Sequence, residues 1–185
     1  AIDVTNAAYG KMGSNTTTVN NRVTSLMNIV DTVFTRDVQI TKTVVALIIR
    51  TSRVYSSTNT SLLGEVGTRW RNNHSNIRRD MVHALGGNPP GGILGIANLS
   101  VVCSNSRGVA VSWWWGSLNG HADLMAHEMG HFLGLFHSSE MPFVNLHDPL
   151  PDTAENDTSN LMFFEASQGG TTLTADQGHV VRGNP

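Results

Sequence analysis

Apolar residues recur at helical spacing near the start of the chain. Between residues 16 and 35 they occupy positions 19, 23, 26, 27, 30, 33 and 34, which places them on one face of a helix. The next segment, VQITKTVVALIIR (residues 38–50), is rich in β-branched residues and nearly continuous in apolar character over its second half. Such a run is typical of a central strand covered on both faces. The pattern therefore predicts an amphipathic helix followed by a buried strand.

The middle of the chain predicts further helices and then two strands. Residues 61–85 fit one or two helices interrupted near residues 72–76, and the GGNPPGG run at residues 86–92 ends them. ILGIANLSVVC (93–103) and GVAVSWWW (108–115) predict two strands joined by SNSR. The second strand has two interpretations, an exposed edge that pairs with an extended peptide or an internal strand. Because side chains alternate along a strand, we expect at least one of Trp113, Trp114 and Trp115 to lie apart from the others, exposed beside a cleft.

The last third of the chain is irregular and ends in a helix. Prolines at 142, 149 and 151 break up the segment after residue 137, and Thr174 with Gln177 matches a capping box before DQGHVVR. A length of 185 residues with 39% hydrophobic residues suits one domain with a sizeable core. We therefore expect a single domain over residues 1–185.

Composition narrows the classes of partner. The formal net charge is −2 and the twelve Lys and Arg residues form no run, so a nucleic-acid surface is not expected. No apolar stretch reaches 18 residues, and the N-terminal residues AIDVTNAAYG resemble no signal peptide, so we expect no membrane span. The single Cys103 has no partner within the chain for a disulfide. Low charge, 14% of residues, with abundant polar residues is a composition that we associate with secreted bacterial proteins.

The stretch HADLMAHEMGHFLGLFH (residues 121–137) concentrates the candidate chemistry. On a helix His127 and His131 lie about 40° apart around the axis, so both imidazoles can bind one metal ion. Glu128 projects farther round, where its carboxylate can hold a water molecule on that ion and act as general base. His121 is off this face, and we expect it at the helix start or on the surface.

His137 completes the set if the helix ends before it. A continuous helix would place His137 about 240° from His131. Gly134 can end the helix and turn the chain so that His137 returns to the face of His131, because glycine adopts left-handed backbone conformations at little cost and commonly ends helices. Three neutral imidazoles leave the fourth tetrahedral position of zinc to water, which is typical of catalytic sites.

These residues resemble a known family. His127, Glu128, His131, Gly134 and His137 match the zinc-binding motif of metzincin metallopeptidases, and SNLM at residues 159–162 is similar to the Met-turn of that clan. The resemblance implies that Met162 lies beneath the metal as a hydrophobic floor and is not a ligand.

The order of segments from residue 16 to residue 137 is most similar to the adamalysin (reprolysin) catalytic domain. The resemblance implies an α+β, α/β/α sandwich-like fold with a mixed twisted sheet and an antiparallel edge strand. It also implies an active-site helix in an N-terminal subdomain (1–134), and an irregular C-terminal subdomain (135–185) with the Met-turn and a final helix. Residues 108–113 would be the edge strand that pairs with substrate. The implied substrate-binding residues are Gly108, Val109, Ala110, Val111, Phe163 and Phe164.

Some features leave the subfamily open. Ser138 follows the third histidine where adamalysins usually carry aspartate, and serine there is more like the matrixins. Phe164 stands where astacin-like and serralysin-like members carry a tyrosine that reaches the metal, so no further protein ligand is expected there. Pappalysin-like bacterial peptidases share the motif and are a second candidate family.

The residues and the resemblance together predict a secreted zinc-dependent endopeptidase that cleaves peptide bonds with a zinc-bound water assisted by Glu128. The expected partner is a protein or peptide substrate of a monomeric enzyme, made as a longer zymogen whose pro-segment is cleaved before Ala1. Calcium is a second candidate ion, because Asp148, Asp152, Glu155 and Asp157 offer oxygen ligands in one loop. Two other functions stay open: a zinc hydrolase of a non-peptide cell-wall amide, and a catalytically latent zinc-binding adhesion or toxin module.

Overall fold

The computed structural model describes residues 1–104, 107–114, 116–138, 150–154, 157–164 and 170–183. Within these residues no helix is long and apolar enough to cross a lipid bilayer. The helices and strands follow in the order β1 (Ile2–Val4), α1 (Asn6–Lys11), α2 (Thr16–Val38), β2 (Leu47–Ile49), α3 (Leu62–Asn73), β3 (Val82–Gly86), β4 (Gly95–Ala97), β5 (Val109–Trp113), α4 (Leu118–Phe132) and α5 (Ala175–Gly183).

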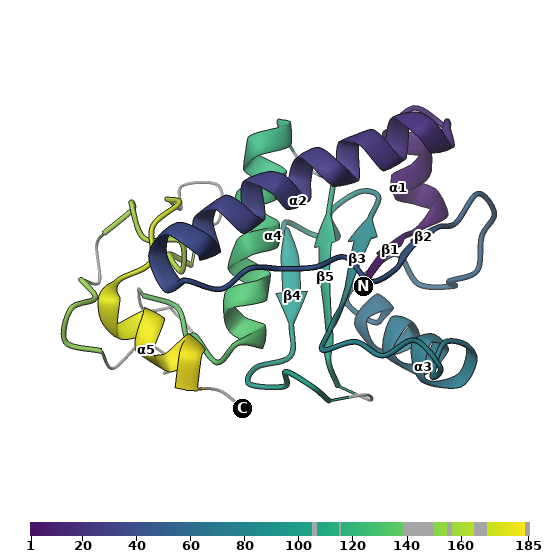
Figure 1. Cartoon of the computed structure of the whole chain (residues 1–185). Coiled ribbons are helices and arrows are strands. Elements are labelled where there is room, and N and C mark those ends of the chain that lie inside the picture. Colours follow the sequence, from purple (N-terminus) through teal and green to yellow (C-terminus); the bar gives the residue numbers. More distant parts are fainter. Residues whose placement is uncertain (105–106, 115, 139–149, 155–156, 165–169, 184–185) are drawn as a thin grey trace.

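A five-stranded mixed sheet forms the middle layer of the molecule. Its strand order is β2-β1-β3-β5-β4, and β4 is antiparallel to β5 while the other neighbours pair in parallel. Helices α2 and α4 pack on one face of the sheet, and α3 covers the other (Figure 1). Helix α5 packs against α2. The α+β fold with helices on both faces of a mixed sheet and an antiparallel edge strand is confirmed.

Strand residues divide between the two faces by simple alternation. On β5, Val109, Val111 and Trp113 join the apolar cluster beneath α3, whereas Ser112 faces His121 of α4. A strand buried on both faces needs side chains that suit two different layers. The small and polar positions of β5 thus lie on the face that α4 covers, and α4 carries the candidate site.

The long helix α2 matches its sequence pattern closely. Asn15 caps the first turn by accepting a hydrogen bond from Thr18 N at 3.0 Å, and Gln39 ends the helix in the left-handed conformation at φ 58°. The apolar residues that predict the helix are all buried, as expected for an amphipathic helix on a core. This element is confirmed, with three more residues at its end.

Two expectations for the first half of the chain are wrong. Residues 38–50 contribute only the three-residue strand β2, which lies at the edge of the sheet and not at its centre. The central strand is β3, and β1 lies between β2 and β3, where Ile2 and Val4 pair with strands on both sides. Val44 and Val45 precede β2 and are 40% and 53% exposed, so this part of the apolar run is not buried.

The second half of residues 61–85 is also not helical. Helix α3 ends at Asn73, and Val82–Gly86 forms β3, buried on both faces between β1 and β5. A short apolar run has no periodicity that separates a buried strand from a buried helix. Residues 82–86 form a strand because they pair with β1 on one side and β5 on the other.

The expectation that residues 108–113 form the edge strand is wrong as well. Strand β5 pairs with β3 on one side and β4 on the other, so the backbone of Val109, Ala110 and Val111 has no free edge for a peptide. Gly108, which precedes the strand, is buried too. The antiparallel strand at this edge of the described sheet is β4.

Candidate functional site

Helix α4 holds the first two histidines of the candidate metal site. Ser117 begins the helix, and its hydroxyl accepts a hydrogen bond from Gly120 N at 3.2 Å. His127 and His131 follow one turn apart on the same face, and His127 is 3% exposed. A continuous helix from Leu118 to Phe132 therefore fixes the relative positions of both imidazoles.

Gly134 lets the chain reverse after the helix. Its φ is +98°, and its backbone N–H donates to His131 O at 2.9 Å while Leu135 N donates to Gly130 O at 3.0 Å. Residues with a Cβ rarely adopt such a backbone conformation. The predicted turn is confirmed, and it returns His137 to the face that carries His127 and His131.

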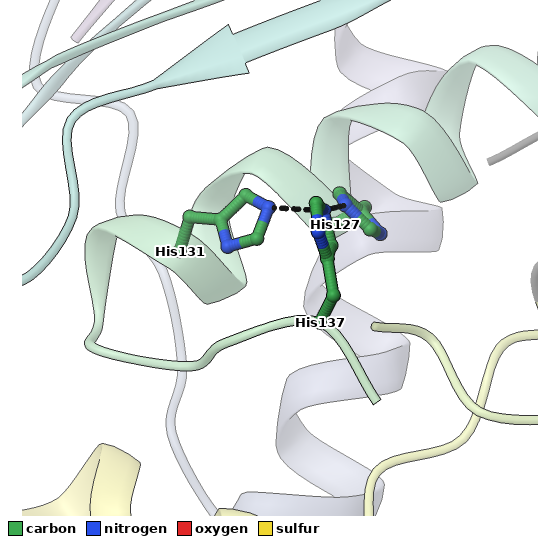
Figure 2. Close-up of side chains that lie close together, drawn as sticks. All are labelled: His127, His131 and His137. Atoms are coloured by element: carbon green, nitrogen blue, oxygen red, sulfur yellow. Dashed lines mark hydrogen bonds between the residues drawn. The ribbon is translucent and has the colours of Figure 1, made fainter. Parts of the chain in front are cut away.

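The three imidazoles meet through their Nε2 atoms (Figure 2). His137 Nε2 lies 3.0 Å from His131 Nε2 and 3.2 Å from His127 Nε2. Nitrogen ligands 2.0–2.1 Å from a tetrahedral zinc ion stand about 3.3 Å apart. Within the described residues this is the one group of three metal-ligating side chains. The donor set and its spacing fit a single zinc ion.

Backbone carbonyls fix the orientation of two of these rings. His127 Nδ1 lies 2.7 Å from Leu161 O, and His131 Nδ1 lies 2.7 Å from Leu135 O. A carbonyl only accepts, so each Nδ1 carries the hydrogen and each Nε2 presents a lone pair. Sequence reasoning missed both carbonyls.

Burial keeps the three histidines neutral, as metal ligands must be. Desolvation lowers the pKa of His127 and His131, and it lowers the pKa of His137 to about 4 with a further contribution from His131. Lone pairs that converge without a cation repel one another. The cluster therefore fits a cation by its chemistry as well as its geometry.

Glu128 lies on α4 beside the edge strand β4. Its side chain is buried, 4% exposed, and Oε2 has no hydrogen-bond partner among the described residues. A Cβ on Gly95 would lie 2.6 Å from Glu128 Cδ, so glycine at this position makes room for the carboxylate. Desolvation raises the pKa of Glu128 to about 8, and a nearby divalent cation would favour the charged form.

Met162 lies beneath α4, against Gly130. A Cβ on Gly130 would overlap the Met162 sulfur, and Met162 is fully buried. Ser138 N donates to Met162 O at 2.9 Å, which ties the segment after His137 to this turn. The structure thus brings Met162 under the histidine-bearing helix.

Two buried amides from different elements support the Met162 turn. Asn160 Oδ1 accepts from Met162 N at 2.8 Å, and Asn160 Nδ2 donates to Gln177 Oε1 of α5 at 3.1 Å. Gln177 also accepts from Thr174 N at 3.1 Å, and its backbone N–H donates to Thr174 Oγ1 at 3.2 Å, so the predicted capping box is present. Sequence reasoning missed Asn160, although its position within SNLM marked the turn.

A cleft of about 400 Å³ opens over the three histidines and Glu128. Residues 92–97 form one wall and Phe164 another. Phe163 is half-buried beside Phe164 but does not line the cleft, and neither does any residue of the predicted set Gly108 to Val111. Of the residues predicted to bind substrate, Phe164 therefore lines this cleft and those of residues 108–111 do not; substrate binding itself stays a prediction.

Other candidate residues lie elsewhere. His121 lies in the first turn of α4, which confirms the helix start as one of its two expected positions. It is fully buried, with Nε2 3.4 Å from Ser112 Oγ, so the surface alternative is wrong. Asp152 and Asp157 accept hydrogen bonds from backbone N–H groups. The other two carboxylates of the predicted calcium loop, at positions 148 and 155, lie outside the described residues.

Comparison with known protein families agrees with a metallopeptidase-like metal site. A family model described as metallo-peptidase family M12B, reprolysin-like, matches residues 20–138. No curated protein sequence matches the chain. Among solved structures, 99 chains are similar.

One of these, described as the structure of a chaperone–substrate complex, is 16% identical over 97% of this chain, with a TM-score of 0.62. The match covers 33% of that longer chain. At this identity the likeness shows the fold alone.

Proposed function

The chain belongs to the reprolysin-like metallopeptidases of family M12B, and we propose that it is a zinc-dependent endopeptidase with Glu128 as its general base. The observation that carries the proposal is the convergence of three histidines, with the Nε2 atoms of His127 and His131 within 3.2 Å of His137 Nε2, beside a buried carboxylate in one cleft. Three histidines leave a coordination position free, which suits catalysis and not a closed structural site.

Each residue has a distinct role in the proposed reaction. When bound, zinc supplies Lewis acidity, which favours deprotonation of water near pH 7 and polarises a carbonyl oxygen. His127, His131 and His137 hold the ion, and the Leu161 and Leu135 carbonyls hold two of the rings in register. Glu128 accepts the proton of the attacking water at a carboxylate oxygen and delivers it to the leaving amine.

Strand β4 is the proposed docking strand for the substrate backbone. Among the strands that the structure describes it pairs with β5 alone, and its residues Gly95, Ile96 and Ala97 line the cleft. An extended peptide can add to such an edge through main-chain hydrogen bonds. The walls of this cleft include the apolar side chains of Phe164 and Ile93, and Ile93 is 45% exposed. Such walls favour substrates with apolar side chains next to the scissile bond.

The proposal includes action outside the cell by a monomer released from a longer precursor. Its support is compositional, since only 14% of residues are charged. Intact-mass measurement of the native product in the culture medium, with N-terminal sequencing, tests secretion and processing together. An intracellular product of unprocessed length would contradict this part alone.

Metal-dependent cleavage of a quenched peptide library tests the proposed function. We expect cleavage by the zinc-loaded protein, loss of cleavage with a chelator, and recovery when zinc is restored. His131→Ala is expected to bind no zinc at the site and to stay inactive in excess zinc. A zinc-loaded wild type that leaves the library intact but clears a cell-wall suspension would replace the peptidase by an amide hydrolase of another class.

A further inference from the structure

A second cleft, of about 410 Å³, lies at the carboxyl ends of the parallel strands. Its walls come from the segments that follow β1, β2 and β3, together with Trp113 at the end of β5. The candidate zinc site lies elsewhere, since none of its residues lines this second cleft. The two clefts are nearly equal in volume.

The topology of the sheet marks this cleft as a ligand site. After β1 the chain passes to α2 on one face of the sheet, and after the neighbouring β2 it passes to α3 on the opposite face (Figure 1). Adjacent strands whose connections leave for opposite faces create a crevice between their carboxyl ends. In open sheets with parallel strands, ligands bind in this crevice.

The lining of the second cleft favours an anion. Among the described residues that line it, Arg53 is the one charged side chain, and none is Asp or Glu. Arg53 Nε donates to Tyr55 O at 3.0 Å and Nη2 donates to Ser56 O, which holds the guanidinium against the rim. Arg53 Nη1 has no hydrogen bond to any described residue. Its two N–H groups are therefore available to an acceptor on a bound ligand. The side-chain amides of Asn6 and Asn88 add neutral donors.

Aromatic side chains give the cleft an apolar floor. Trp113 is 1% exposed and Tyr55 is 5% exposed, and both line it. The Trp113 indole lies across Gly86 at the end of β3, with Nε1 2.7 Å from where a Cβ of Gly86 would be. That buried Nε1 donates to no described residue, and a buried N–H without an acceptor is costly. This N–H is thus a buried, unpaired donor of a residue that lines the cleft.

We propose that this second cleft binds a small organic carboxylate, with its anionic group on Arg53 and its apolar body on Trp113 and Tyr55. The volume is that of an ordinary small-molecule pocket. Charge-assisted hydrogen bonds to the guanidinium fix the carboxylate, and the aromatic floor and the prolines at 89 and 90 take up the apolar body. This site is independent of the proposed peptidase activity.

The test is a titration of the zinc-loaded, ¹⁵N-labelled protein with benzoate, and with benzamide as its neutral counterpart. The signals followed are the Trp113 indole N–H, identified with a Trp113→Phe variant, and the Arg53 Nε–H. We expect both signals to shift saturably with benzoate up to about 10 mM and to respond weakly to benzamide. We expect Arg53→Gln to weaken benzoate binding at least about tenfold.

Matched variants distinguish binding at Arg53 from general attraction to positive charge. Arg71→Gln removes an exposed positive charge from the last turn of α3 and is expected to leave benzoate binding unchanged, and Arg53→Lys is expected to retain most of it. Equal binding of benzamide, or unchanged binding by Arg53→Gln, would overturn the proposal. Benzoate that perturbs only the histidine signals of α4 has bound at the zinc site, which would overturn it equally.

Discussion

Gly95→Ala tests whether the Glu128 carboxylate works where the structure places it. The new Cβ would lie 2.6 Å from Glu128 Cδ, whereas two carbon atoms in contact stand 3.5–4.0 Å apart. The carboxylate must therefore move by about 1 Å, and a displacement of that size costs about 100-fold in rate, or about 3 kcal/mol in the activation barrier. The three atoms nearest to that Cβ all belong to Glu128, so zinc binding by the histidines is expected to persist.

The assay for Gly95→Ala is steady-state cleavage of a quenched peptide, with zinc content measured on the same sample. Gly64→Ala is the matched control, because a Cβ on Gly64 of α3 meets no atom within 4 Å. We expect kcat/KM to fall about 100-fold in Gly95→Ala and to stay near the wild-type value in Gly64→Ala. A Gly95→Ala protein within threefold of wild type would refute the placement of Glu128 beside β4.

Three further predictions concern stability. Asp3 is fully buried and accepts hydrogen bonds from Arg50, Tyr55 and Trp70, so Asp3→Asn is expected to lower the urea-unfolding free energy by about 3–5 kcal/mol because it leaves the Arg50 charge unpaired. Desolvation lowers the pKa of His83 to about 3 and that of His121 to about 4, whereas histidine in an unfolded chain has a pKa near 6.5. Between the folded and unfolded pKa values the unfolded state binds more protons than the folded state. The unfolding free energy is therefore expected to fall as the pH drops from about 6.5 toward 4. His83→Gln is expected to reduce this slope by roughly 1 kcal/mol per pH unit in urea-unfolding series. Zinc removal by a chelator is expected to lower the unfolding free energy by about 4 kcal/mol relative to free zinc at a thousand times its dissociation constant, measured by thermal melting.

Each of these has a control and an outcome that contradicts it. The control for Asp3→Asn is Arg36→Gln, which breaks an ion pair whose arginine is 48% exposed and should lower the unfolding free energy by less than about 1 kcal/mol. If Asp3→Asn lowers the unfolding free energy no more than Arg36→Gln does, the stabilising role of the buried Asp3 network is contradicted. An unchanged pH slope in His83→Gln would mean that this histidine is not neutral in the fold. A melting temperature that zinc raises in His131→Ala as much as in wild type would locate the ion elsewhere.

The three histidines of the candidate zinc site were predictable because their chemistry and spacing are local. His127 and His131 are related by one helical turn, and the reversal at Gly134 is encoded by a single residue with φ +98°. The backbone carbonyls of Leu161 and Leu135 were not predictable, because every residue has a carbonyl and only the folded turn brings these two to the rings. Helix α2 was predictable for a similar reason, since seven apolar positions between residues 19 and 34 recur at helical spacing.

The sheet was harder, because strand position depends on pairing between distant segments. Strand β1 has three residues, too few for a periodic pattern, yet it lies between β2 and the central strand β3 and leaves β2 at the edge. Whether β4 or β5 is the edge depends on β3 pairing with β5, a contact that neither strand's own sequence encodes. Asp3 was missed for the same reason, because its partners Arg50, Tyr55 and Trp70 are at least 47 residues away.

The most direct measurement of the central claim compares wild type with Glu128→Gln, both loaded with zinc and assayed on one quenched peptide. The amide keeps the shape of the side chain but does not accept a proton from water. We expect one zinc ion per chain in both proteins and a loss of several orders of magnitude in kcat for the variant. A zinc-loaded Glu128→Gln protein that retains most of the wild-type rate would contradict the role of this carboxylate.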